Sequence, residues 1–330
     1  MNNNETNIVL SGVQPSGGLH IGNYLGAIQN FVKMQKEYNC FFCVVDLHAI
    51  TVKQNPIDLK NNTLEVVATY IASGIDPHKS IIFNQSGISA HAELAWIFNC
   101  VTRMGWLNRM TQFKDKAGKD KENASSGLFI YPNLMAADIL LYKATHVPVG
   151  NDQKQHLELT RDIAQKFNRD FDCENFFPIP EPLIERDISR IMSLKDGTQK
   201  MSKSDSSEYS RINLADEEDQ IVKKIKKAKT ANDAMPDNLD DVIKLNEVNN
   251  LLNIYSGFSG TEKQKLIDEY KGKDFSNFKH NLADLLVEKI KPISNEIKKL
   301  MQDKTFLKKT ILTGNLRANK VAKNTINEVY

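Results

Sequence analysis

Strand-like and helix-like hydrophobic patterns alternate along the first half of the chain. Continuous apolar runs such as Cys40 to Val45 are typical of strands that are buried on both faces of a sheet. The longer segments between these runs place apolar residues three or four positions apart, which is the spacing of a helix packed on a core. The alternation predicts an α/β fold in which helices cover a parallel sheet.

The predicted elements divide the chain into two parts. We expect strands at 8–11, 40–45, 80–84, 145–149 and 189–194, and helices at 21–38, 59–73, 90–104, 131–142 and 153–167. Gly74 is expected to end the second helix, because glycine commonly follows the last helical turn. From residue 214 onward the pattern is helical, so we predict an α/β domain over 1–205 and an all-helical domain over 206–330.

Composition and charge narrow the class of protein. The chain has 330 residues, of which 41% are hydrophobic and 25% charged, as in an ordinary globular protein of about two domains. No run approaches 18 apolar residues and the first six residues are polar, so we expect neither a membrane span nor a signal peptide. A net charge of +2 excludes nucleic-acid binding by bulk charge but allows a local basic face.

The four cysteines predict no disulfide framework. Cys40 and Cys43 form a C-x-x-C inside a strand-like run, where residues three apart point to opposite faces. Buried structural thiols are therefore favoured over a redox or metal role, and no structural metal is expected. We expect a cytoplasmic protein.

A glycine-rich turn spans residues 12–23, between the first strand and the first helix. Such a turn lets a ligand approach the backbone, and a helix N-terminus attracts phosphate. It is not a P-loop, because Gly18 and Leu19 replace the lysine and hydroxyl residue of that motif. Taken alone, a purely structural tight turn explains it equally well.

Two lysine-bearing loops could also bind anions. Residues 112–126 carry Lys114, Lys116, Lys119 and Lys121 without an apolar period, which suits a solvated loop or an anion-binding one. The loop from Lys200 to Ser204 combines two lysines with two serines, a set that can hold a polyphosphate.

Taken together, these segments resemble a known family. The sequence from His20 to Asn23 and the Lys200-Met-Ser-Lys-Ser204 loop resemble the two signatures of class I aminoacyl-tRNA synthetases. Further blocks resemble tryptophanyl-tRNA synthetases of the bacterial type, at 12–17, 46–51, 110–114, 131–142, 147–156 and 158–163. The resemblance implies a Rossmann-like catalytic domain, a helical domain that binds the tRNA anticodon arm, and a homodimer. It also implies activation of tryptophan with ATP, release of pyrophosphate, and transfer of tryptophan to the terminal ribose of tRNA(Trp).

The resemblance assigns a set of ATP-binding residues. They are Gln14, Pro15, Ser16, Gly22, Asn23, Gly150, Asn151, Asp152, Ile191, Lys200, Met201, Ser202, Lys203 and Ser204. Catalytic roles fall to His20, Lys200 and Lys203, and to Lys116 as pyrophosphate leaves. Asn23 stands where the signature usually has a second histidine, so it can donate a hydrogen bond but carries no charge. Mg²⁺ is expected to arrive with ATP.

Asp138 is the candidate for amino-acid specificity. It is the only charge between Leu134 and Tyr142, and an acid in an apolar helix is costly to bury unless it is paired. The resemblance implies that its carboxylate accepts the indole N–H of tryptophan; the alternative is an acid that faces solvent or a lysine. The remaining tryptophan-binding residues would be Met135, Val147 and Val149 around the ring and Tyr131, Gln153 and His48 at the polar end. For the apolar three, core packing is the alternative.

Positive charge gathers in the helical part. Residues 285–330 hold ten basic and four acidic residues, and 223–229 form a second basic run. Both could position a tRNA through its phosphates, or could be ordinary solvated helix faces.

Three other functions are alternatives to this reaction. A tyrosyl enzyme shares the architecture, but the Met135-Ala-Ala-Asp138 block disfavours it. A silent paralogue that only binds tRNA or tryptophan need not keep both signatures. A nucleotidyl transferase outside translation would not explain the helical domain.

Overall fold

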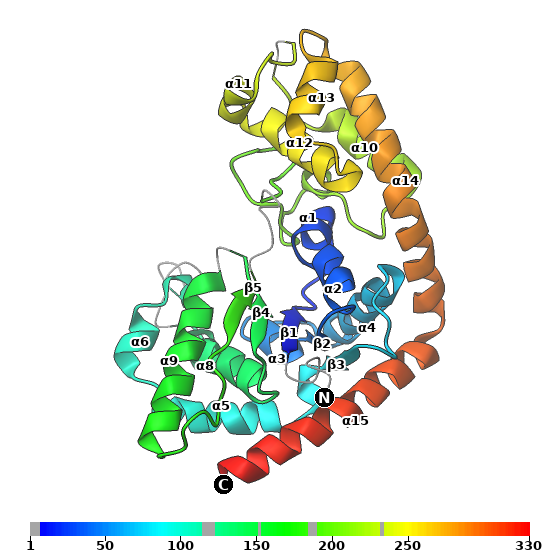
Figure 1. Cartoon of the computed structure of the whole chain (residues 1–330). Coiled ribbons are helices and arrows are strands. Elements are labelled where there is room, and N and C mark those ends of the chain that lie inside the picture. The colour runs from blue at the N-terminus through cyan, green and yellow to red at the C-terminus, as the bar shows by residue number, and fades with distance from the viewer. Residues whose placement is uncertain (1–6, 114–122, 151–152, 184–189, 232–233) are drawn as a thin grey trace.

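The computed structural model describes residues 7–113, 123–150, 153–183, 190–231 and 234–330 (Figure 1). Its centre is a parallel sheet with the order β3-β2-β1-β4-β5. The strands are β1 (Ile8–Val13), β2 (Asn39–Val44), β3 (Ile81–Asn84), β4 (His146–Pro148) and β5 (Glu181–Leu183). The predicted α/β class with a parallel, Rossmann-like sheet is confirmed.

The strand order reverses at the centre of the sheet. β1 pairs with β2 on one side and with β4 on the other, with Val9 opposite His146. In open parallel sheets the crevice beyond the carboxyl ends of such neighbours is where ligands bind. The glycine-rich turn after β1 and Gly150 after β4 therefore lie at the same edge.

Both faces of the sheet are buried, as the apolar run in β2 predicts. Cys40 and Phe42 pack into the core on one face, whereas Phe41 and Cys43 pack into the core on the other. Both cysteines are free, and burial raises the pKa of the Cys40 thiol to about 12. The prediction of buried structural thiols on opposite faces is confirmed.

Helices cover the two faces. They are α1 (Ile21–Asn23), the π-helical turn η2 (Tyr24–Ile28), α2 (Gln29–Met34), α3 (Asp46–Ala49), α4 (Pro56–Ala72), the 3-10 turn η3 (Gln85–Gly87), α5 (Ala90–Val101), α6 (Met104–Asn108), α8 (Ser126–Leu140) and α9 (Lys154–Asp170). Asn55 caps the start of α4, and Gly74 follows its end with φ of +105°. The π-helical turn lies within the predicted helix 21–38.

The predicted strand at 189–194 is wrong. The fifth strand is β5, which contains Pro182; a proline is tolerated there because β5 is an edge strand. In the described part of the predicted segment, Ser193 N–H donates to the Gln199 carbonyl at 2.8 Å, so it pairs with the following loop instead. Its apolar residues Ile191 and Leu194 are buried in the core rather than in the sheet.

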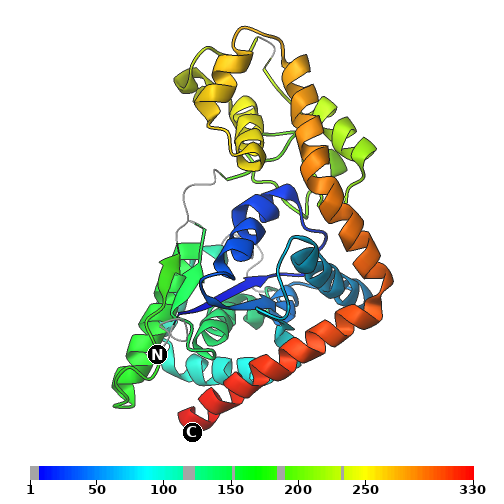
Figure 2. The ribbon, with the colours of Figure 1, turned by 45° about the vertical axis from the view of Figure 1, so that its right-hand side comes forward.

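The C-terminal part is helical, as predicted. It contains the 3-10 turn η5 (Glu208–Ser210) and the helices α10 (Glu218–Lys227), α11 (Leu239–Lys244), α12 (Asn246–Ser259), α13 (Lys263–Tyr270), α14 (Phe275–Gln302) and α15 (Lys304–Val329). α10 to α13 gather in the upper lobe, and α14 descends from it (Figure 1). α15 then turns back and packs against β3, α4 and α5 (Figure 2). None of the helices in the described ranges is long and apolar enough to span a membrane.

Candidate active site

The glycine-rich turn brings the backbone close to two other segments. Gly17 has a φ of +120°, and a Cβ built on it would lie 3.9 Å from Cβ of Lys203. A Cβ on Gly22 would lie 3.0 Å from the ring of His20 and 3.5 Å from Cβ of Ile191. The positive φ favours glycine at 17, and the tight contact with the His20 ring favours it at 22.

His20 forms the N-cap of α1. Its Nδ1 accepts the Gly22 N–H at 3.1 Å, and Oδ1 of Asn23 accepts the His20 N–H at 3.1 Å. Burial, together with the charges of Lys203 and Arg211, lowers the pKa of His20 to about 3. Because Nδ1 is an acceptor and the ring is neutral, the proton is on Nε2. His20 therefore offers an N–H donor rather than a positive charge.

The base of the loop from Lys200 to Ser204 is held in place by contacts with the core and with α12. Met201 N–H donates to the Ile191 carbonyl at 3.1 Å, and the Met201 side chain is buried in the core. The Asn250 carboxamide of α12 accepts from the Met192 N–H at 2.8 Å and donates to its carbonyl at 2.9 Å. A Cβ on Gly197 would lie 2.6 Å from the backbone at the start of α12, so the loop is pressed against that helix.

The tip of this loop meets the glycine-rich turn. Lys203 Nζ donates to the Gln14 carbonyl at 3.0 Å, across 189 positions of sequence. Burial lowers the pKa of Lys203 to about 8, although Glu65 acts in the opposite direction. The hydroxyls of Ser202 and Ser204 lie 2.9 Å apart. Glu65 of α4, which sequence reasoning missed, is thus a half-buried residue whose charge acts on Lys203.

Of the other residues predicted to bind ATP, some are described by the structure and some are not. Pro15 is buried, while Gln14, Ser16 and Lys200 are exposed and Gly150 follows β4. Asn151, Asp152 and Lys116 lie outside the described residues.

Asp138 lies near the end of α8 at 2% exposure, so the predicted burial is observed. Its Oδ2 lies 2.7 Å from His48 Nε2, and its Oδ1 lies 2.6 Å from His91 Nδ1 and 2.7 Å from Gln85 Nε2. Burial by itself raises the pKa of this carboxyl, but the two histidines outweigh it and lower the pKa to about 2. Asp138 is thus an ionised group that only accepts hydrogen bonds.

Sequence reasoning missed Gln85 and His91, two of the three residues that contact the Asp138 carboxylate. His91 Nε2 lies 2.8 Å from the hydroxyl of Tyr142. Gln85 Oε1 accepts the N–H groups of Leu47 and His48 at 3.0 and 3.3 Å, which directs its amide nitrogen at Asp138. No local motif marks Gln85 or His91, because they meet Asp138 only when η3 and α5 pack beside α3 and α8.

A second polar cluster adjoins this one. The Tyr131 hydroxyl donates to Gln112 Oε1 at 2.7 Å and lies 2.7 Å from His156 Nε2, while burial raises the Tyr131 pKa to about 12. The rings of His48 and Tyr131 meet edge to face at 6.0 Å. The structure thus brings together the predicted residues His48, Tyr131 and Asp138.

The remaining predicted tryptophan-binding residues make no hydrogen bond or ring contact with these two clusters among the described contacts. Val147 is buried and Met135 and Val149 are half-buried in the core that contains α8, while Gln153 directly precedes α9.

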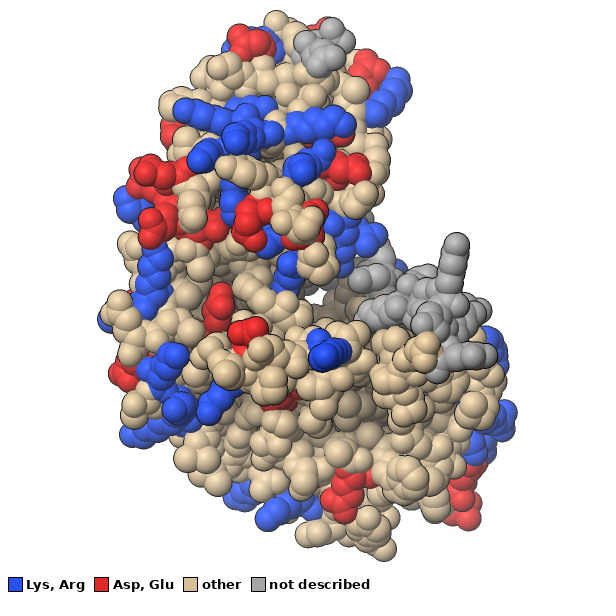
Figure 3. All heavy atoms as spheres, turned by 180° about the vertical axis from the view of Figure 1, so that it is seen from behind, with Lys and Arg blue, Asp and Glu red and all other residues tan. Residues whose placement is uncertain are grey.

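The predicted basic surfaces are partly neutralised. Within the run 223–229, Lys224 is buried and pairs with Asp216 at 2.5 Å. Lys298 on α14 pairs with Glu217 at 2.7 Å. The face in Figure 3 shows acidic and basic side chains interspersed over the helical lobe. Neither run is a uniform positive strip.

Comparison with known proteins identifies the family. The family model described as tRNA synthetases class I (W and Y) matches residues 1–291. A tryptophan–tRNA ligase of Brucella melitensis is 53% identical, over 98% of this chain and 96% of its own length. That of Rickettsia felis is 55% identical, over 97% of this chain and 96% of its own.

Solved structures agree with the sequence relatives. The tryptophanyl-tRNA synthetase of Mycoplasma pneumoniae superposes with a TM-score of 0.86 at 34% identity, covering 98% of this chain and 96% of that one. The Campylobacter jejuni enzyme, complexed with ADP and tryptophan, has a TM-score of 0.83 at 35% identity, covering 98% of both chains. The chain belongs to the class I tRNA synthetases and, within them, to the tryptophan–tRNA ligases.

Proposed function

We propose that this site joins tryptophan to ATP and that the activated amino acid then passes to the terminal ribose of tRNA(Trp). Membership of the family makes the chain an aminoacyl-tRNA ligase that uses ATP. The observation that carries the proposal is the contact between Lys203 and the Gln14 carbonyl. It unites the two anion-binding segments at the carboxyl end of β1, where an open parallel sheet presents its ligand crevice.

The nucleotide-binding half of the site would act by positioning the substrates and by stabilising the charge that develops on the phosphates. In-line displacement at a phosphate depends mainly on orientation and on stabilising developing charge. Lys200 and Lys203 would face the triphosphate, Lys116 would join them as pyrophosphate leaves, and the neutral His20 would donate from Nε2. The other ATP contacts would come from Gln14, Pro15, Ser16, Gly22, Asn23, Gly150, Asn151, Asp152, Ile191, Met201, Ser202 and Ser204. Because the Met201 side chain is buried in the core, its contact would come from the backbone.

Mg²⁺ would enter this half with the nucleotide. The described residues contain no cluster of three potential metal ligands from His, Cys, Asp and Glu. The ion would take most of its ligands from phosphate oxygens and from water. Its chemistry would be charge neutralisation on the phosphates.

The amino-acid half would recognise tryptophan through Asp138. A carboxylate has about four lone-pair positions, and three are used by His48, His91 and Gln85. The remaining position would accept the indole N–H. Met135, Val147 and Val149 would surround the ring, with His48, Tyr131 and Gln153 at the polar end.

The remaining assignments concern the whole molecule. Residues 1–205 would hold ATP and tryptophan, and residues 206–330 would contact the anticodon arm of tRNA. A homodimer in the cytoplasm is proposed; the large exposed side chains of Trp96 on α5 and Met104 on α6, at 70% and 63% exposure, suit a face covered by a second copy.

Amino-acid-dependent ATP–pyrophosphate exchange, run with each of the twenty amino acids and without tRNA, tests the proposal. We expect exchange with tryptophan alone. Exchange with tyrosine would keep the reaction and overturn the assigned pocket. Absence of exchange from folded protein with Mg²⁺ present would favour a silent binder.

A further inference from the structure

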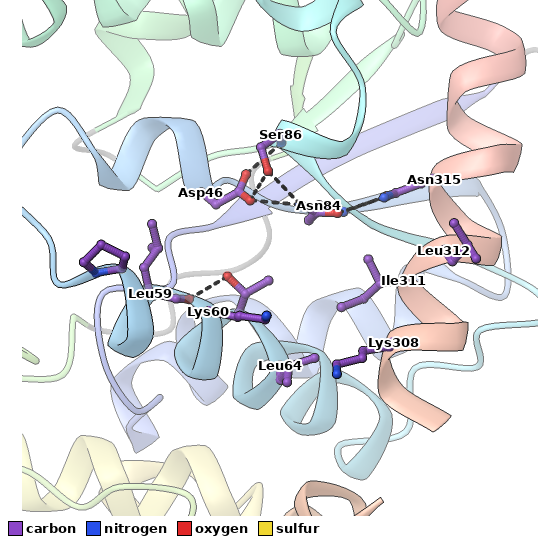
Figure 4. A pocket seen from close by; sticks show the side chains of 12 residues that line it. Asp46, Leu59, Lys60, Leu64, Asn84, Ser86, Lys308, Ile311, Leu312 and Asn315 are labelled. Carbon is purple, nitrogen blue, oxygen red and sulfur yellow. Dashed lines mark hydrogen bonds between the residues drawn. The ribbon is translucent and has the colours of Figure 1, made fainter. Parts of the chain in front are cut away.

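A pocket of about 490 Å³ lies between α4 and α15 at the carboxyl ends of β2 and β3 (Figure 4). This is the outer side of the sheet, away from the β1–β4 crevice. Its volume is within the range of sites for small organic ligands. Its polar lining includes Asp46, Lys60, Asn84, Ser86, Lys308 and Asn315.

One end of the pocket is polar and already satisfied internally. Both oxygens of Asp46 accept hydrogen bonds: from the Ser86 N–H at 2.8 Å, the Ser86 hydroxyl at 2.5 Å and Asn84 Nδ2 at 2.9 Å. The Asn84 backbone N–H donates to Asn315 Oδ1 at 3.1 Å, and Asn315 Nδ2 returns a bond to Asn84 Oδ1 at 2.9 Å. This end is therefore a preformed floor that ties α15 to β3.

The walls and the opposite end differ in character. Leu59 and Leu64 of α4 face Ile311 and Leu312 of α15 across the pocket (Figure 4). Away from Asp46, Lys60 and Lys308 extend toward the space between the two helices. In the part of the chain that the structure describes, neither lysine has a carboxylate within ion-pair distance.

We propose that this pocket binds a small organic anion with an apolar body. The apolar walls would bury the body, and Lys60 and Lys308 would hold a carboxylate, sulfonate or phosphate group. Charge complementarity selects an anion, because the one acid of the lining, Asp46, is covered by three donors at the far end.

The site is built into the same turn as the amino-acid subsite. Ser86 holds Asp46 in the pocket floor, and the preceding residue of η3, Gln85, donates to Asp138 at 2.7 Å. A ligand that shifts α15 or the floor would move this turn, so occupancy of the pocket is coupled to tryptophan affinity. This coupling rests on the proposed function, whereas the binding itself does not.

Fluorescence titration with 8-anilinonaphthalene-1-sulfonate tests the binding, with N-phenyl-1-naphthylamine as the matched neutral dye. We expect one saturable site with a preference for the sulfonate. Replacing Lys60 and Lys308 together by Ala should weaken sulfonate binding roughly tenfold, as expected for loss of two partly exposed ion pairs, and abolish the preference. Lys309→Ala, which alters the neighbouring lysine outside the lining, should change neither. No binding to the wild type, or equal effects of both sets of substitutions, would overturn the proposal.

A second pair of variants tests the apolar wall. Leu312→Glu places a negative charge in the lining and should weaken binding of the sulfonate dye. Leu316→Glu, at a similarly exposed position outside the lining, should not. Equal binding by these two variants would also contradict the proposal.

Coupling has its own readout. Saturating tryptophan should change the dye's Kd by the same factor by which the dye changes tryptophan affinity, because linkage is reciprocal. An unchanged Kd would remove the coupling and leave the site. Failure of wild-type pyrophosphate exchange would instead overturn the proposed function without touching the dye result.

Discussion

His91 donates its Nδ1 proton to Oδ1 of Asp138 across 2.6 Å. The direction is fixed because Asp138, with its pKa lowered to about 2 chiefly by His48 and His91 against the effect of burial, has no proton to give. The other nitrogen of His91 lies 2.8 Å from the Tyr142 hydroxyl. α5 thus orients the carboxylate of α8 that is proposed to choose the substrate.

Asp138→Asn should sharply reduce tryptophan activation. The amide carries no charge, and its N–H₂ group would face His48, Gln85 or His91, which need an acceptor. The kcat/KM for tryptophan should therefore fall by on the order of 10²-fold or more. Asn is a sharper test than Ala, which leaves three buried donors unpaired at about 1–3 kcal/mol each. Pyrophosphate exchange measures the effect, and wild-type exchange in the Asn variant would contradict the assigned role.

His91 should act as a positioning residue. His91→Asn keeps a donor close to the place of Nδ1, whereas His91→Leu removes it. We expect the Leu variant to raise KM for tryptophan at least roughly tenfold and the Asn variant to recover part of this, with KM for ATP unchanged in both. A parallel rise of both KM values would indicate a general loss of structure, and the positioning role would be abandoned.

The Asp138 carboxylate should make stability depend on acid pH. Its pKa in the fold, about 2, is below the ordinary aspartate value of 3.8, so its contribution to stability is complete above about pH 4 and is lost as pH falls toward 2. The difference in unfolding free energy between wild type and Asp138→Asn should therefore shrink over this interval. Urea titrations at pH 5, 4, 3 and 2.5 measure it; a constant difference would show that the pKa is not lowered.

Lys203 should give the pyrophosphate exchange an alkaline limit. With its pKa lowered to about 8 by burial, the free enzyme loses this charge as pH rises through that value. kcat/KM for ATP should fall between about pH 7.5 and 9, since this ratio reports groups of the free enzyme. The Lys203→Arg variant stays charged, so its kcat/KM for ATP should show no such alkaline fall even if its rate is lower. An alkaline fall retained in the Arg variant would assign the titration to another group.

The sequence predicts features that depend on local patterns and misses those created by packing. The alternation in β2 places Cys40 and Cys43 on opposite faces because the period of a strand is local. β5 was missed because three residues that include Pro182 carry no strand signal. Asp138 stands out as a lone acid in an apolar helix, whereas Gln85 and His91 carry no signal of their own. They join the site only through contacts between elements.

The docking of α15 should depend on Gly314. A Cβ at this position would lie 1.7 Å from the Ile82 carbonyl oxygen, which is backbone and cannot rotate away. Gly314→Ala should therefore force α15 from β3 and destabilise the protein by about 1–3 kcal/mol or more. Gly105→Ala is the matched control, because nothing lies within 4 Å of its added Cβ on α6, and it should be neutral or stabilising by up to about 1 kcal/mol. Urea unfolding compares the two, and equal stabilities would mean that α15 does not rest on the sheet as tightly as the Ile82 contact requires.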